Sequence, residues 1–114
     1  MTTNYSLGHE AEKRAAEYLQ AKGFEIVALN WSNRLAEIDI VAKKDDVVYF
    51  VEVKYRSTAN QGGGLDYITP AKLKQMEFAA RCWVEEQKYQ GGYELSAIEL
   101  SADFQITEFI EELT

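Results

Sequence analysis

Two short apolar segments separated by four charged residues constrain the fold of this 114-residue chain most strongly. Residues 37–42 and 47–53 are rich in β-branched and other apolar side chains, a composition typical of buried strands. Only the polar residues 43–46 separate them, so the two strands are expected to pair as an antiparallel hairpin. If Asp45 and Asp46 alone form the turn, Asp39 and Glu52 lie opposite each other.

This hairpin would gather two carboxylates and an ammonium on one face of the sheet. Side chains alternate between the faces of a strand, so Asp39 and Val41 would share a face. Glu52 and Lys54 would meet them from the partner strand. Buried carboxylates are costly unless a positive charge compensates them. We expect Mg²⁺ or Mn²⁺ to do so, bound by Asp39, Glu52 and the backbone carbonyl of Val53. The alternative is a solvated sheet face where Lys54 forms a weak surface ion pair.

A third carboxylate comes from the first helix. Residues 4–22 have helical periodicity, and Gly23 is a natural stop. Glu12 falls inside the apolar stripe of this helix, whereas the other charged residues lie on its polar side. We expect its carboxylate to reach the metal; alternatively, Glu12 lies at the edge of the stripe and extends to solvent. His9 is the only histidine and lies off the stripe, which argues against zinc chemistry.

The remaining segments complete a mixed sheet. Residues 24–29 are expected to form a strand before the hairpin, giving an antiparallel meander. Residues 93–100 and 104–110 have the composition of two further strands that follow a helix, which makes a parallel crossover. The expected fold is α/β, a mixed sheet of about five strands flanked by two helices, in a single domain of residues 1–114. The three glycines at 62–64 lie in either a substrate lid or a mobile connection.

The second helix carries apolar residues on two sides. Thr and Pro at residues 69–70 provide its start, and the glycines at 91–92 end it. One apolar face packs on the sheet, while Phe78, Cys82 and Tyr89 lie nearly opposite that face. These three residues predict either a homodimer contact or cover from the domain's own loops.

Charge limits the partners that the chain can bind unaided. There are 12 basic and 19 acidic residues, which give a net charge of −7. Proteins that bind nucleic-acid phosphates usually carry a basic patch. Six of the acids and no basic residue fall in residues 94–114, and bound metal would offset the carboxylates of the site. The single Cys82, the lack of a membrane-length apolar run and an N-terminus unlike a signal peptide predict a cytoplasmic protein without a membrane partner.

A set of motifs spans nearly the whole chain: Gly8-x-x-x-Glu12, Asn30-Trp31, Glu37-Ile38-Asp39, Phe50-Val51-Glu52-Val53-Lys54-x-Arg56 and Lys72. Together they resemble the YraN-like family of small bacterial proteins, which is similar to Holliday junction resolvases. The resemblance implies the PD-(D/E)XK, or restriction-endonuclease-like, fold. It also implies that Glu12 is the helix acid, Asp39 and Glu52 are metal ligands, and Lys54 is the signature lysine. Residues 94–96 depart from the family pattern because Glu-Leu-Ser replaces an Arg-Phe-Asp sequence.

These features predict a Mg²⁺- or Mn²⁺-dependent nuclease-fold protein that acts on DNA phosphodiester bonds, with branched or single-stranded DNA as the substrate. DNA is favoured over RNA. Lys54 and Glu12 would be catalytic, and Arg56 and Lys72 would contact the substrate. The alternative is a noncatalytic dimeric module that keeps the nuclease fold and recruits nucleic-acid enzymes, a reading that the acidic balance favours.

Overall fold

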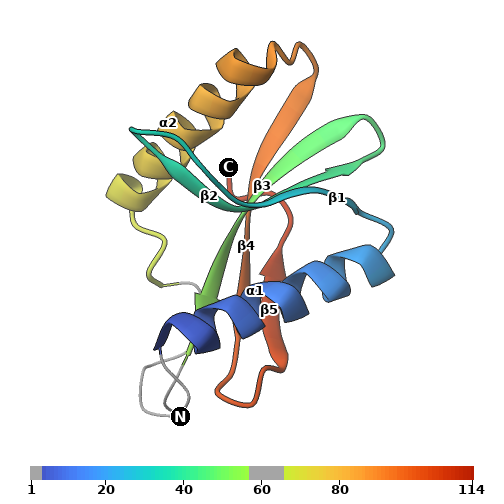
Figure 1. The fold of residues 1–114 in the computed structure, drawn as a ribbon, viewed down its shortest axis with the longest axis vertical. Helices are drawn as coiled ribbons and strands as arrows, with labels where there is room; N and C mark the ends of the chain where they lie inside the picture. Colours follow the sequence, from blue (N-terminus) through green and yellow to red (C-terminus); the bar gives the residue numbers. More distant parts are fainter. Residues whose placement is uncertain (1–3, 57–65) are drawn as a thin grey trace.

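A five-stranded sheet lies between two helices in the computed structural model, which describes residues 4–56 and 66–114 (Figure 1). The three glycines at 62–64 therefore lie outside the described residues. Neither helix within the described part of the chain combines the length and apolar character that a membrane crossing needs. The elements follow in the order α1 (Asn4–Ala21), β1 (Glu25–Ser32), β2 (Glu37–Lys44), β3 (Val47–Tyr55), α2 (Pro70–Gln87), β4 (Gly92–Leu100) and β5 (Ile106–Ile110).

The sheet has the order β1-β2-β3-β4-β5 and mixes two strand orientations. β3 and β4 are parallel and joined by α2, whereas the other neighbouring pairs are antiparallel. This confirms the predicted α/β fold with a meander and a parallel crossover. The β2–β3 turn is also confirmed, since Lys44 pairs with Val47. Asp45 and Asp46 have φ values of 52° and 64°, the left-handed conformation that a tight hairpin turn requires.

Each helix covers its own face of the sheet. Neighbouring β3 residues divide between these faces: Tyr49 and Val51 pack under α1, whereas Val48 and Phe50 pack under α2. The α1 face is dominated by small and aliphatic residues, and its buried members are Ala11, Ala15, Ala16, Leu19, Phe24, Ile40, Ala42, Tyr49, Val51, Ile98 and Leu100. The α2 face is built around aromatic rings, and its buried members are Ile38, Val41, Val48, Phe50, Met76, Ala79, Ala80, Trp83 and Leu95.

Strict alternation fails at Ile38. Ile38 and Val41 both pack on the α2 face, while Ile40 between them packs on the α1 face. Asp39 lines a pocket with buried residues of the α2 face, the face of Val41 as predicted, so the irregularity lies at Ile38. Asn30 lies level with Asp39 on β1 and has a φ of 52°, a left-handed conformation that asparagine tolerates better than most residues. The change of face in β2 therefore coincides with an irregular residue in its neighbour.

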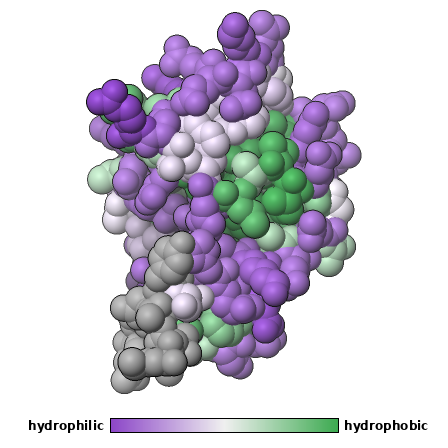
Figure 2. All heavy atoms as spheres, viewed as in Figure 1, coloured by the Kyte–Doolittle hydropathy of each residue, from purple (hydrophilic) through white to green (hydrophobic). Residues whose placement is uncertain are grey.

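The edge strand β1 is also irregular, and it is partly uncovered. The β1–β2 register shifts between Ile26 and Ala28, which leaves Val27 as an extra residue in a bulge. Figure 2 shows an apolar patch where β1 passes beside α1. The large apolar side chains of β1 that are exposed are Val27 and Leu29.

Several predicted boundaries shift by two or three residues, among them the ends of β1, β2 and β3, the end of α2 and the start of β5. α2 ends at Gln87, earlier than the glycines at 91–92, because Lys88 adopts a left-handed conformation. Its backbone N–H donates to the carbonyls of Glu85 and Val84, which closes the last turn. β5 begins at Ile106, two residues later than predicted, following a turn at 101–105.

Candidate active site

The candidate site lies where β2 separates from β3. Pairing between these strands ends at Ile40 and Val51, while β3 stays paired with β4 through Tyr55. Beyond that point the Val53 N–H donates to the Asp39 side chain, with 2.8 Å between the nitrogen and Oδ2. The Asp39 carboxylate thus replaces a backbone acceptor at the end of the ladder.

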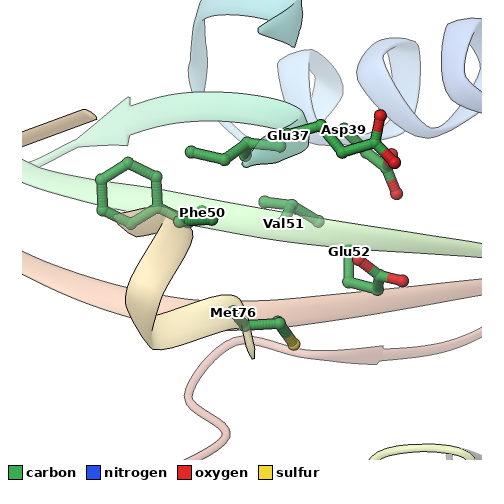
Figure 3. Close-up of a pocket in the computed structure, with 8 residues that line it drawn as sticks. Glu37, Asp39, Phe50, Val51, Glu52 and Met76 are labelled. Carbon is green, nitrogen blue, oxygen red and sulfur yellow. The ribbon is translucent and has the colours of Figure 1, made fainter. Parts of the chain in front are cut away.

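Glu52 lines the same pocket as Asp39. Figure 3 shows both carboxylates on one side of this pocket, away from the ring of Phe50. Burial raises the pKa of the Asp39 carboxyl to about 7, and the negative charge of Glu52 acts in the same direction. The hydrogen bond from Val53 opposes this rise but does not cancel it. The two carboxylates therefore form a site that would gain from a bound cation.

Glu12 approaches this site from α1. Burial raises the pKa of its carboxyl, and the charges of Glu37 and Glu52 raise it further. The charge of His9 and the side chain of Asn30 oppose this rise in the pKa, and Oε2 of Glu12 is buried without a hydrogen-bond partner in the described structure. The structure thus brings the predicted helix acid near the carboxylates of the hairpin. It leaves one oxygen of Glu12 free to accept a proton or a hydrogen bond.

Lys72 occupies the first turns of α2 and reaches the same carboxylates. Its Nζ lies 2.9 Å from Oε2 of Glu52, and about a quarter of each side chain is exposed, 28% and 23% respectively. The sequence predicted Lys72 as a substrate contact, and the structure gives it a partner within the site. An ammonium here partly offsets the charge of Glu52 and leaves Asp39 uncompensated.

Tyr67 holds Lys54 beside the site, and sequence reasoning missed this residue. The Lys54 Nζ lies 5.5 Å from the centre of the Tyr67 ring, and the Arg56 guanidinium lies 5.6 Å from the same centre. Both distances are typical of cation–π contacts. The Tyr67 hydroxyl is buried and has no hydrogen-bond partner among the residues described, and burial raises its pKa. Its short segment before α2 carries no periodic signal that could have identified it.

Arg56 forms ion pairs beside the site. Its Nε lies 2.7 Å from Oε2 of Glu99, and its Nη2 lies 3.1 Å from Oδ1 of Asp66. Thr107 donates to the other oxygen of Glu99 at 2.7 Å. Glu99 is almost fully buried and was not identified from the sequence. Arg56 was predicted to contact substrate. Its observed ion pairs and its contact with the Tyr67 ring give it a structural role beside Lys54.

The predicted dimer residues have different surroundings. The Tyr89 ring lies 5.8 Å from that of Trp83, and its hydroxyl donates to the carbonyl of Gly92 at 2.7 Å. The domain's own residues therefore hold Tyr89 in place. Phe78 is 48% exposed and Cys82 is partly exposed. The homodimer stays a prediction.

The donor set fits a hard divalent cation. Asp39 and Glu52 offer two carboxylates, and the carbonyl of Val53 belongs to the residue that already binds Asp39. Mg²⁺ commonly takes one or two protein carboxylates and completes its shell with water and phosphate oxygens. No three His, Cys, Asp or Glu side chains within residues 4–56 and 66–114 are grouped around one ion position. A shell with two carboxylates is therefore the arrangement that these residues support.

Comparison with known proteins places the chain among small bacterial proteins without an assigned activity. The model of the uncharacterised protein family UPF0102 matches residues 11–106. A UPF0102 protein of Pseudomonas putida is 41% identical over 86 residues, which cover 75% of this chain and 69% of that protein. A UPF0102 protein of Christiangramia forsetii is 38% identical over 86 residues, covering 75% and 72%. One of Mycolicibacterium gilvum is 39% identical over 87 residues, covering 75% and 71%.

The environment of Asp39 predicts an unusual dependence of stability on pH. Its carboxyl has a pKa of about 7 in the folded protein, against about 3.9 in an unfolded chain. The folded state holds this proton more tightly, so ionisation of Asp39 lowers the free energy of unfolding as the pH rises from about 4 to about 7. Relative to Asp39→Asn, which cannot ionise, the wild type should lose on the order of a few kcal/mol across this window. Urea unfolding at a series of pH values measures the difference, and parallel profiles for the two proteins would contradict it.

Proposed function

The chain belongs to the uncharacterised protein family UPF0102, the YraN-like family, and we propose that it is a Mg²⁺- or Mn²⁺-dependent nuclease that cleaves phosphodiester bonds in DNA. One observation carries this proposal. Asp39 and Glu52 share a pocket with the ammonium of Lys72, where the penalty for ionising Asp39 is largely uncompensated. A divalent cation and a phosphate would supply the missing partners.

Asp39 and Glu52 would hold the metal ion, with the Val53 carbonyl as a further oxygen ligand. When bound, the metal would activate water and neutralise the charge that develops on the phosphate. The protein's own contribution is to fix the ligands in advance. Asp39 is held by the Val53 N–H, and Glu52 projects from a strand paired with β4 along its whole length. Such preorganisation reduces the reorganisation needed during the reaction.

Lys72 would change partners when the site is filled. In the structure its Nζ lies 2.9 Å from Oε2 of Glu52. The ammonium would therefore compete with a metal ion for this carboxylate. A cation on Glu52 would displace this ammonium, and Lys72 is exposed enough to turn to a phosphate oxygen. Lys72 would therefore pair with Glu52 before the metal binds and with a substrate phosphate once the metal is bound.

Lys54 and Glu12 would act on the reacting groups. The Tyr67 ring holds the Lys54 ammonium on the β3 side of the site, where it would stabilise negative charge on the phosphate. Oε2 of Glu12 has no hydrogen-bond partner within the described residues, and the raised pKa of its carboxyl suits a group that accepts a proton from attacking water. Glu12 would thus take the proton of the attacking water, and Lys54 would stabilise the charge that develops on the phosphate.

A noncatalytic dimeric module is the second candidate function. The net charge of −7 opposes unaided binding to nucleic acid, and the half-exposed Phe78 offers an apolar contact for another protein. In such a module the carboxylates and Lys72 would have no catalytic role. Metal binding and cleavage separate the two candidates.

We expect Mn²⁺ to bind the wild-type protein with a stoichiometric heat that disappears in Asp39→Ala and in Glu52→Ala. Each substitution removes one of the two carboxylates that the proposed ion needs. Glu25→Ala is the matched control, because Glu25 is an exposed acid on β1 and its loss changes the net charge equally. Isothermal titration calorimetry measures the heats. Equal isotherms for all four proteins would remove the metal site.

Lys72→Ala should bind Mn²⁺ more tightly than the wild type, by up to about fivefold, because the ammonium competes with the ion for Glu52 and exposed ion pairs contribute about 0.2–1 kcal/mol. Lys74→Ala controls for the lost charge, since Lys74 is an exposed lysine of the same helix. The same calorimetry compares their dissociation constants. Weaker binding by Lys72→Ala than by Lys74→Ala would mean that Lys72 supports the ion rather than competing with it.

Lys54→Ala should lower the rate of DNA cleavage by about 10²–10³-fold, the usual effect of removing one group that stabilises transition-state charge. Mn²⁺ binding and substrate binding should stay close to wild type, because this ammonium acts mainly in the transition state. Lys43→Ala, at an exposed lysine of β2, is the control. Single-turnover assays on duplex, branched and single-stranded DNA and on RNA provide the rates. If the wild type cleaves none of them with metal present, the interaction module replaces the nuclease.

A further inference from the structure

A groove continues from the carboxylates to two exposed apolar side chains. Its lining includes Asp39, Glu52 and Lys72, and also Leu35 of the β1–β2 turn and Phe78 of α2. Leu35 is 73% exposed and Phe78 is 48% exposed. Phe78 follows Lys72 by six positions in α2, a rise of about 9 Å. The groove therefore presents charged and apolar groups within the reach of a single nucleotide unit.

The fold holds Leu35 in its exposed position. The side-chain oxygen of Asn33 accepts the N–H groups of both Leu35 and Ala36 at 2.8 Å, and the Asn33 N–H donates to the Ala36 carbonyl at 2.9 Å. The side-chain nitrogen of Asn33 donates to Oε2 of Glu86 at 2.9 Å, which ties the turn to α2. Exposed apolar side chains beside a polar site often mark a binding surface. The hydrogen-bonded turn and α2 thus hold the side chains of Leu35 and Phe78 in fixed positions relative to each other.

We propose that this groove binds an unpaired nucleobase of a DNA strand whose phosphate lies at the Asp39–Glu52 site, with the base stacked on Phe78 and in contact with Leu35. The inference rests on the proposed function and narrows its substrate to DNA with single-stranded or unpaired nucleotides at the cleavage point. Aromatic side chains stack on the face of any base, so this contact would select strand structure rather than sequence.

Charge explains why a base contact is needed. Lys72 is the one basic residue among the described residues that line the groove, and its partner in the structure is Glu52. A duplex binder usually draws its affinity from many phosphate contacts, which an acidic surface does not provide. Stacking supplies affinity that does not depend on positive charge. It requires an open base face, which paired and stacked duplex bases do not present to a side chain.

A second copy of the chain is the competing occupant of Phe78. A self-contact through this residue would bury the ring and leave the acidic end of the groove without a role. The groove is continuous with Asp39, Glu52 and Lys72, and this continuity favours a ligand that carries both an apolar ring and a phosphate. Sedimentation velocity on the same variants distinguishes the two occupants.

The test uses single-stranded DNA that carries a fluorescent aminopurine base, titrated with the full chain and Mn²⁺ in a Lys54→Ala background that preserves the strand. Stacking on Phe78 should quench the fluorescence. Phe78→Leu should abolish the quenching and weaken binding by at least about fivefold, the lower range for a base-stacking contact. Phe78→Trp should restore both. Leu29→Ala is the control, since Leu29 is 47% exposed on β1 and does not line the groove.

Several outcomes would overturn the inference. Unchanged binding by Phe78→Leu, or equal affinity for matched duplex and single strands, would show that no base occupies the groove. A dimer that Phe78→Leu dissociates, with strand binding intact, would assign the surface to a second copy. If Mn²⁺ binds Asp39 and Glu52 as expected but no strand binds, the groove inference fails and the metal site stands. If strand binding depends on Phe78 but neither Mn²⁺ binding nor cleavage occurs, the groove stands and the proposed nuclease fails.

Discussion

The Val53 N–H bonds to the carboxylate of Asp39 at the point where β2 stops supplying backbone partners to β3. This one hydrogen bond completes the end of a ladder and fixes an acid at the mouth of the pocket. Without it, separation of the strands would leave the Val53 amide without an acceptor. The same bond therefore contributes to the stability of the central sheet and to the electrostatics of the site. It also opposes the burial that raises the pKa of Asp39, so the acid remains able to ionise near neutral pH.

Local sequence patterns predicted the strands of the sheet but not the irregularity in β2. Apolar composition and a short polar turn predicted the hairpin, and the two aspartates of the turn adopt the left-handed conformation that its length requires. The irregularity at Ile38 had no local signal. It coincides with the φ of Asn30 on the neighbouring strand, a residue that becomes its neighbour only when the sheet forms. Alternation is a property of regular strands, and this site lies where regularity ends.

The site residues also divide into those that the sequence pattern identifies and those that it does not. Glu12 was identifiable because an acid inside an apolar helical stripe conflicts with burial, and the spacing of Asp39, Glu52 and Lys54 follows from the hairpin. Tyr67 and Glu99 could not be found by such reasoning. Tyr67 contacts one cation on β3 and one directly after it, and Glu99 contacts Arg56 across 43 residues of sequence. The contact of Glu99 with Arg56 depends on the parallel pairing of β3 with β4, which brings distant parts of the chain together.

The bulge at Val27 affects how the molecule behaves in a crowded solution. β1 ends the sheet, and its exposed Val27 and Leu29 could make it a template for another chain to add as a strand. The extra residue breaks the even spacing of backbone donors and acceptors that such an addition requires, and the left-handed Asn30 breaks it again three residues later. An apolar edge can thus remain uncovered without recruiting copies of itself into an aggregate.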